Sequence, residues 1–355
     1  MDKVRGNVFV DNITIKDIAK ALGISTSTVS RALRDSYEIN PETKRLVQEY
    51  AEKMHYRPNP IALSLKENRS LSIGVIVPEI ANNYFSQAIN GIEAAAYDRG
   101  YHVVIFQSQE SYERELEKIE HLAARRVDGL LMSLSSQTVD MEHLKSLQER
   151  GLPLVFFDRI PAEIDTHKVV ADNSGGAFQA TAHLLATGRR RIAHITSQPG
   201  LSITKERLSG YLSALEQYDV PFDENLVKYC SYTLDEVDAN LDALFALLAP
   251  PDAFMTAADR LALGYYAGLK KRHIRIPEDV AFVGFSNLTV AELLNPPMSV
   301  VVQPAFQMGH TAAGLLLDLI EKKPKHPVFR TVKLATELFI RESSLPKGGK
   351  VNRSF

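Results

Sequence analysis

From Leu71 onward, short runs of apolar residues alternate with longer segments in which apolar residues recur every three or four positions. The short runs predict buried strands, and the longer segments predict helices. The first series of expected elements is Leu71–Val77, Tyr84–Arg99, His102–Gln107, Glu113–Arg125, Val127–Ser133, Met141–Arg150 and Leu154–Phe157. The second series is Val169–Ala171, Gly175–Thr187, Ile192–Thr196, Lys205–Tyr218, Leu226–Cys230, Val237–Leu248, Ala253–Thr256, Leu261–Lys271 and Val280–Phe285.

Repeated strand–helix units predict parallel sheets with helices on both faces. Two such series have the size of two doubly wound α/β subdomains. Folds of this kind bind ligands at the carboxyl ends of their strands. We therefore expect a small molecule to bind between the two subdomains.

Residues 14–55 carry a different pattern, which predicts three short helices. Each expected helix follows a good capping residue, and these residues are Thr14, Ser25 and Asn40. Gly23 suits a left-handed turn between the first two helices. The apolar positions expected to be buried are Ile15, Ile18, Ala19, Leu22, Val29, Ala32, Leu33, Leu46, Val47, Tyr50, Ala51 and Met54. Two helices joined by a glycine turn and supported by a third predict an all-α helix-turn-helix headpiece.

The second of these helices exposes hydroxyl and guanidinium groups. They belong to Thr26, Ser27, Thr28, Ser30, Arg31 and Arg34. Hydroxyls suit phosphates and base edges, and arginine suits guanine or phosphate, so the pattern favours DNA binding. The alternative is a small helical protein-interaction module with a polar face.

The prolines of Tyr56–Pro60 end the third helix, and the short apolar segment Ile61–Leu65 follows. A segment this short cannot sustain a helix alone in water. It is either a plain linker or a hinge that folds only on DNA.

Composition narrows the class of protein. The chain has 355 residues and a net charge of -2, with 41 Lys and Arg against 43 Asp and Glu. Within residues 1–66, 11 basic residues outnumber 8 acidic ones, which gives the headpiece a slight positive charge. Cys230 is the only cysteine, which excludes a disulfide framework. We expect a cytoplasmic protein, because no signal sequence or membrane-spanning apolar run is present.

Enzyme motifs are absent from the sequence. It contains no G-x-G-x-x-G after a strand, no phosphate-binding G-x-x-x-x-G-K-[ST], no H-E-x-x-H and no G-x-S-x-G. We therefore expect no catalytic residues, no metal and no cofactor. A sugar-metabolising enzyme and a free solute-binding protein remain as alternatives that fit the α/β body but leave the headpiece unexplained.

Several segments resemble the lactose-repressor (LacI/GalR) family of bacterial transcription regulators. The strongest are TIKDIAKALGISTSTVSRAL at 14–33 and YRPNPIALSL at 56–65, and RRVDGLLM, VVADNSGGA, ERLSGY, AADRLALG and PEDVAFVGF follow in the body. The resemblance implies a homodimeric repressor whose body has the periplasmic-binding-protein fold. The implied parts are an arm at 1–13, the headpiece at 14–58, a hinge helix and linker at 59–70, the body at 71–340 and a tail at 341–355. The chain is expected to cross between subdomains near 158–168, 286–304 and 326–334.

The resemblance also implies site residues. The implied contacts with an operator, a pseudo-palindromic double-stranded DNA, are Thr14, Ser25, Thr26, Ser27, Thr28, Ser30, Arg31, Tyr56, Asn59, Ala62 and Leu65. Leu65 matches the hinge residue that wedges into the minor groove. The implied effector contacts are Asn83, Tyr84, Phe85, Ser133, Asp158, Arg159, Arg207, Tyr232, Asp259 and Ser286.

One position departs from the family. Sugar-responsive members usually have an aspartate after the VGF strand, where this chain has Ser286. The effector is expected to be a sugar, a sugar acid or a sugar phosphate. Loss of a carboxylate that would repel an anion favours the last two. We expect a dimer, because Pro346–Phe355 has no apolar heptads for a tetramer-forming coiled coil.

Overall fold

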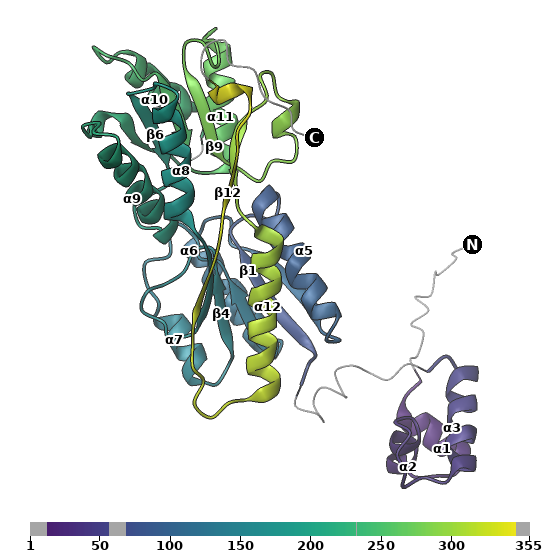
Figure 1. Cartoon of the computed structure of the whole chain (residues 1–355). Helices are drawn as coiled ribbons and strands as arrows, with labels where there is room; N and C mark the ends of the chain where they lie inside the picture. The colour runs from purple at the N-terminus through teal and green to yellow at the C-terminus, as the bar shows by residue number, and fades with distance from the viewer. Residues whose placement is uncertain (1–12, 57–68, 232, 346–355) are drawn as a thin grey trace, which may run out of the picture. The chain divides into compact units, whose positions relative to one another are not determined.

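The computed structural model describes residues 13–56, 69–231 and 233–345, and the chain divides between Ser70 and Leu71 into a headpiece and a body (Figure 1). The expected DNA contacts Asn59, Ala62 and Leu65, with the hinge segment, lie outside the described residues, as does Tyr232.

The headpiece consists of α1 (Ile15–Leu22), α2 (Thr26–Ala32) and α3 (Pro41–Lys53). Thr14 and Asp17 form a capping box at the start of α1, in which the Thr14 backbone N–H donates to Asp17 Oδ2 over 2.8 Å. Gly23 ends α1 with φ 65°. The buried core is Ile18, Ala19, Val29, Ala32, Val47 and Ala51. The helix-turn-helix prediction is confirmed.

The prediction that two residues of α3 are buried is wrong. Leu46 is 47% exposed and Met54 is 38% exposed. Val47 and Ala51, four residues apart, form the buried stripe of α3, and Leu46 lies about 100° around the helix from Val47. Met54 is the residue at which α3 ends, so it lies beyond the buried stripe.

The first subdomain of the body contains a sheet that is parallel throughout. Its strands are β1 (Ser72–Val77), β2 (His102–Gln107), β3 (Gly129–Met132), β4 (Leu154–Phe157), β5 (His167–Ala171) and β11 (Thr331–Leu334), in the order β11-β5-β4-β3-β1-β2. One face packs against α5 (Asn83–Tyr97) and α12 (Ala305–Lys322), and the other against α6 (Tyr112–Ala124) and α7 (Glu142–Glu149).

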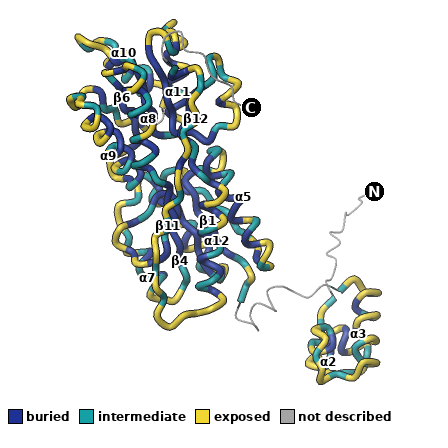
Figure 2. The backbone as a smooth tube through the Cα atoms, in the orientation of Figure 1, coloured by how far each residue is buried: buried dark blue, intermediate teal, exposed yellow. Residues whose placement is uncertain are grey.

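The second subdomain repeats this plan. Its strands are β6 (Ile192–Thr196), β7 (Val227–Tyr229), β8 (Ala253–Thr256), β9 (Ala281–Phe285), β10 (Ser299–Val302) and β12 (Glu337–Phe339), in the order β12-β10-β9-β8-β6-β7. Only β12 runs antiparallel to its neighbour among the pairings described for this sheet. The helices α8 (Asn173–Ala186) and α9 (Ser202–Gln217) cover one face, and α10 (Leu234–Phe245) and α11 (Asp259–Lys271) cover the other. Figure 2 shows central strands such as β1, β4, β6 and β9 buried inside the two subdomains.

The crossings between subdomains differ from two of the expected positions. β5 pairs with β4 in the first sheet, so the first crossing follows Ala171 instead of falling at 158–168. The second, at Gln303 and Pro304, lies inside the expected 286–304. The third falls between β11 and β12, just after the expected 326–334. A buried parallel strand is apolar in either sheet, so the apolar run Val169–Ala171 does not indicate which of the two sheets the strand joins.

The end of the body also differs from the sequence prediction. β10, α12, β11 and β12 were not among the expected elements. The body continues past residue 340, because Ser343 and Ser344 are buried and the Ser343 hydroxyl donates to the Phe282 carbonyl over 2.7 Å. The expected tail therefore begins within folded structure.

The helices α5 and α12 lie side by side and approach closely through glycine (Figure 1). A Cβ atom on Gly309 would overlap the backbone oxygen of Ala88, and one on Gly91 would overlap the backbone oxygen of Phe306. Backbone atoms cannot yield as a flexible side chain can. This contact therefore requires glycine at both positions.

We expect Gly309→Ala to destabilise the body by about 1–3 kcal/mol, because α12 must move away from α5. Gly314→Ala on the same helix is the matched control, since a Cβ there meets nothing within 4 Å. Removing a flexible glycine at that open position should stabilise the protein by roughly 0.5–1 kcal/mol. Denaturant unfolding of the two variants measures both effects, and equal effects would contradict the close helix contact.

Candidate functional site

The outer surface of α2 carries the polar groups expected to contact DNA. Thr26, Ser27, Arg31 and Arg34 are exposed, whereas Thr28 and Ser30 are half-buried. The Ser25 hydroxyl lies 2.7 Å from the Ser27 hydroxyl and 2.8 Å from that of Thr28. Val29 and Ala32 are fully buried on the opposite side. The packing of α2 therefore presents one polar face outward.

Arg31 on α2 and Arg34, which lies beyond the end of α2 at Ala32 and not within the helix as expected, have partners within the headpiece. Arg31 Nη1 lies 3.2 Å from Glu38 Oε2, and both side chains are about half exposed. Arg34 donates to the Ser30 hydroxyl over 2.9 Å. An exposed ion pair contributes about 0–1 kcal/mol, so Arg31 can exchange Glu38 for another acceptor at little cost.

The remaining described headpiece candidates lie at the two ends of the unit. Thr14 is exposed at the start of α1. Tyr56 is half-buried against the headpiece core, and burial raises the pKa of its hydroxyl. Both positions leave a polar group at the surface of the headpiece.

The described effector candidates lie where the carboxyl-terminal ends of the two sheets meet. Asp158 and Arg159 follow β4, Ser133 follows β3, Asp259 begins α11 after β8, and Ser286 follows β9. All are buried, as are Tyr84, Phe85 and Arg207, whereas Asn83 is half-buried. We call this region the junction.

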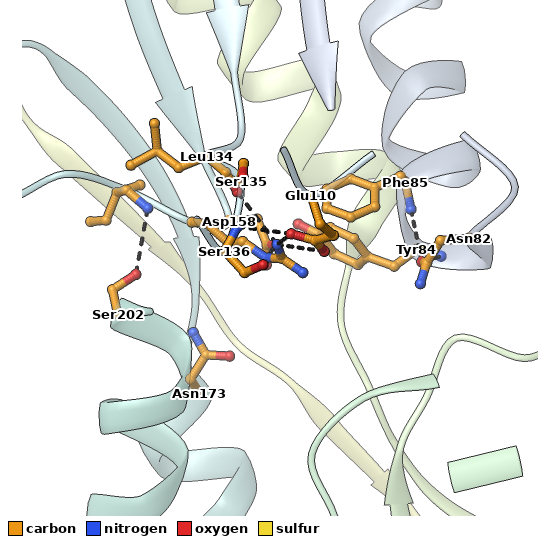
Figure 3. A network of polar contacts seen from close by, with 12 residues as sticks. Asn82, Tyr84, Phe85, Glu110, Leu134, Ser135, Ser136, Asp158, Asn173 and Ser202 are labelled. Carbon is orange, nitrogen blue, oxygen red and sulfur yellow. Dashed lines mark hydrogen bonds and ion pairs between the residues drawn. The ribbon is translucent and has the colours of Figure 1, made fainter. Parts of the chain in front are cut away.

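Asp158 lies within the polar network of the first subdomain (Figure 3), and Arg159 follows it in the sequence. Arg159 Nε lies 4.0 Å from Asp158 Oδ2, and the guanidinium lies 5.9 Å from the centre of the Phe85 ring. Burial raises the pKa of Asp158, although the charges of Arg159 and Arg207 offset part of the shift. Burial and the neighbouring Asp158 raise the pKa of Tyr84 well above its usual value.

Arg207 projects from α9 in the second subdomain. Its Nε donates to Asn173 Oδ1 over 2.9 Å, and Nη1 donates to the carbonyl of Ala257. The guanidinium lies 4.3 Å from the centre of the Phe285 ring. These contacts fix the position of the guanidinium, and its charge also acts on the carboxyl groups of Asp158 and Asp259.

Asp259 joins the second subdomain to the same region. Its Oδ1 accepts from the backbone N–H of Asn287 over 2.7 Å. Burial raises the pKa of Asp259, and interactions with the Ser286 hydroxyl and with the backbone of Asn287 and Tyr84 offset part of the shift. Ser286 therefore contacts a carboxyl group from α11 instead of supplying one.

Some polar residues at the junction were missed from the sequence. Gln87 donates to the Asn287 carbonyl over 3.1 Å, and Asn287 Nδ2 donates back to Gln87 Oε1 over 3.0 Å. Glu110 binds Arg159, and Asn173 binds Arg207. Buried amides just after strand ends are the signal that could have identified Asn287. The expected residues Asn83 and Ser133 share no described hydrogen bond or ion pair with the other candidates.

Buried hydroxyls without partners surround this network. Among the described residues, Ser108, Ser133, Thr196 and Thr204 have buried side-chain oxygens that make no hydrogen bond with the protein. Ser108, Ser133 and Thr196 lie at or just after the carboxyl ends of β2, β3 and β6. Buried polar atoms normally have hydrogen-bond partners, so these hydroxyls are suited to bind a polar ligand.

The described residues contain neither a candidate metal site nor a candidate membrane-spanning helix. No group of three or more His, Cys, Asp or Glu side chains is placed to hold a metal ion. No helix in this part of the chain is long and apolar enough to span a membrane.

A helix-turn-helix headpiece followed by two binding-protein subdomains defines a ligand-responsive DNA-binding regulator. Residues 14–59 match the bacterial regulatory proteins of the lacI family, and residues 70–342 match the periplasmic binding proteins and sugar binding domain of the LacI family. The chain belongs to the LacI family of bacterial transcriptional regulators, whose members are not enzymes. The family and fold predicted from the sequence are confirmed.

Individual relatives agree with this assignment. The HTH-type transcriptional repressor PurR of Vibrio atlanticus is 32% identical over 87% of this chain and 92% of its own length. CytR of Escherichia coli K12, also an HTH-type transcriptional repressor, is 31% identical over 93% of this chain and 96% of its own.

Solved structures extend the likeness. A complex of the transcriptional regulator CelR with cellobiose has a TM-score of 0.70 and 32% identity, and the match covers 93% of this chain and 99% of that one. The lac repressor dimer bound to operator and the anti-inducer ONPF shares the fold, with a TM-score of 0.81 at 22% identity over 94% of this chain and 100% of that one.

His194 lies on β6 beneath Arg207 and stacks on Tyr211 with ring centres 5.0 Å apart. Burial, followed by the positive charge of Arg207, lowers the pKa of His194 to about 3. The folded protein therefore holds this imidazole uncharged, whereas the unfolded chain protonates it below about pH 6.5. Stability that is present above about pH 6.5 must be lost as the pH falls toward the folded-state pKa.

We expect the free energy of unfolding of the wild type to fall more steeply between about pH 7 and about pH 5 than that of His194→Gln, which cannot take up the proton. His102→Gln at the exposed start of β2 is the control and should follow the wild type. Denaturant unfolding at each pH gives the slopes. Parallel curves for the wild type and His194→Gln would show that the buried imidazole does not set the pH dependence.

Proposed function

We propose that this protein is a homodimeric, cytoplasmic transcriptional repressor that places α2 of each protomer in a major groove of a pseudo-palindromic operator. The observation that carries the proposal is the polar face of α2, where Thr26, Ser27 and Arg31 are exposed while Val29 and Ala32 anchor the helix from beneath. Twofold symmetry in the protein requires twofold symmetry in the DNA.

The remaining operator contacts are those that the resemblance to the LacI family implies. Thr14, Ser25, Thr28, Ser30, Tyr56 and Asn59 would contact the DNA backbone, while Thr26, Ser27 and Arg31 would read bases. Ala62 and Leu65 would enter the minor groove from the hinge, where an apolar wedge unstacks a base step and bends the duplex.

The effector in this proposal is a small sugar-like molecule held at the junction. Buried hydroxyls without a hydrogen bond to the protein, together with the buried guanidinium of Arg207, suit a molecule rich in oxygen. A related regulator was solved with cellobiose, and another LacI-family regulator was solved with ribose. Both subdomains supply groups to the junction, so a bound molecule stabilises one relative arrangement of them. Coupling of this kind is reciprocal between effector and operator.

We expect Arg31→Ala to weaken binding of the preferred operator by about 1–3 kcal/mol, the usual range for a bidentate guanine contact. Arg45→Ala on the exposed surface of α3 is the matched charge control and should change the affinity much less. Selection of binding sites from a random duplex library, followed by fluorescence anisotropy on the selected site, measures both. A wild type that selects no sequence above random DNA would refute the repressor proposal.

We expect Arg207→Ala to lower effector affinity by about 2–5 kcal/mol, because a buried charge-assisted contact is lost. Operator binding without effector should stay unchanged. Lys205→Ala, an exposed residue on the same helix, is the control. Calorimetric titration of each variant with the best sugar from a thermal-shift screen gives the affinities. Equal effector affinities for wild type and Arg207→Ala would remove Arg207 from the effector site.

A further inference from the structure

The charges at the junction do not favour an anion. Arg159 and Arg207 bring positive charges, whereas Glu110, Asp158 and Asp259 bring carboxyl groups. Within about 6 Å of an arginine the sign of the field depends on such near neighbours. The carboxylate that position 286 lacks is therefore replaced by others that the folded chain gathers from elsewhere.

The contact between Glu110 and Arg159 is the closest of these charge pairs. Arg159 Nη1 lies 2.9 Å from Glu110 Oε1 and 2.8 Å from Oε2 (Figure 3). Glu110 Oε2 also accepts from the backbone N–H of Ser136 over 2.8 Å. Burial opposes ionisation of Glu110, but Arg159 and Ser136 outweigh it and lower the pKa of the carboxyl. Glu110 is thus ionised at neutral pH and neutralises Arg159.

Backbone conformation gives independent support. Gln109 and Glu110 have φ values of 52° and 60°, and Asp158, which precedes Arg159, has φ 61°. Left-handed conformations are uncommon for residues other than glycine, and glutamine and glutamate are not among the types that favour them. Such backbone is unfavourable for these residue types and is found most often at functional sites. Both sides of the ion pair therefore lie on or beside left-handed backbone.

Arg159 lies inside the junction. Its side chain is 8% exposed, and it lies near both Asp158 and Phe85. An anionic group of an effector that approached this guanidinium would meet the carboxylate of Glu110, which holds Nη1 through both of its oxygens. The ionised carboxylate of Glu110 beside the guanidinium would also repel an added anion.

We propose that Glu110 is a specificity-determining residue, which occupies Arg159 and restricts the effector site to neutral, hydroxyl-rich molecules. The proposal rests on the proposed function, in which the effector binds at the junction. It reverses the preference for a sugar acid or sugar phosphate that Ser286 alone suggested. The competing role for Glu110 is purely structural, a tie between the segments after β2, β3 and β4.

Glu110→Gln separates these two roles. The amide oxygen can still accept from Ser136, but the negative charge is gone and Arg159 becomes available to an anion. The probes are inorganic phosphate and two matched pairs, ribose with ribose 5-phosphate and cellobiose with cellobionate. Thermal shift and calorimetric titration report binding. Glu120→Gln on the exposed surface of α6 is the matched charge control.

We expect the wild type to bind the neutral member of a pair more tightly and to show no thermal shift with phosphate. Glu110→Gln should bind the anionic member at least about tenfold more tightly than the wild type does, as a charge-assisted contact to Arg159 becomes possible. It should also gain a thermal shift with phosphate. The double variant Glu110→Gln/Arg159→Gln should lose both gains, and a purely structural tie would produce neither.

Unchanged anion binding in a folded Glu110→Gln variant would overturn the proposal, as would a gain that persists in the double variant. If Glu110→Gln does not fold, the wild type decides, because a preference for the anionic member of either pair, or a thermal shift with phosphate, contradicts the inference. Failure of the proposed function gives a different result, namely no selective operator binding by the wild type. The thermal shift with inorganic phosphate tests the role of Glu110 even when the effector is unknown.

Discussion

The constraint on which the body depends is the burial of polar strand ends between two parallel sheets. Parallel strands end in loops at one edge of each sheet, and in this body the two edges face each other. Water is largely excluded there, so each charged or amide group needs a protein partner or a ligand. Protein partners are provided by the reciprocal hydrogen bonds between Gln87 and Asn287 and by the contacts of Arg207.

The same constraint ties the junction to the chain crossings. Asn173, which binds Arg207, lies directly after the first crossing, and Gln303 at the second crossing accepts from Asn287 through its carbonyl over 2.8 Å. A molecule that takes over the donors of Arg207 must therefore replace a bond to a crossing segment. Binding at the junction therefore changes the contacts of the segments about which the subdomains turn.

The helices of the headpiece could be predicted from the sequence because they depend on local interactions. The strand order of the body could not be predicted in full, because it depends on pairing between distant residues. The caps at Thr14 and Ser25 and the turn at Gly23 depend on residues within four positions, so their signals are complete in the sequence. The sheet that β5 joins depends on partners far along the chain, and its apolar run suits either sheet. The expected effector residues were implied by the resemblance to the family and stay predictions, whereas the contact of Gln87 with Asn287, 200 positions apart, could not be predicted from the sequence.

Charge at the junction shows why a single position does not determine the electrostatic field that an effector meets. A serine after β9 removes one carboxylate, and from that position alone an anion looks favourable. The field that an effector meets is the sum over every loop at the junction, and Glu110 reaches Arg159 across 49 positions of sequence. Because Coulomb interactions are stronger at low dielectric, a carboxylate supplied by another loop can replace the missing one. Selectivity for neutral or anionic effectors can therefore be retained while the residue at any single loop changes.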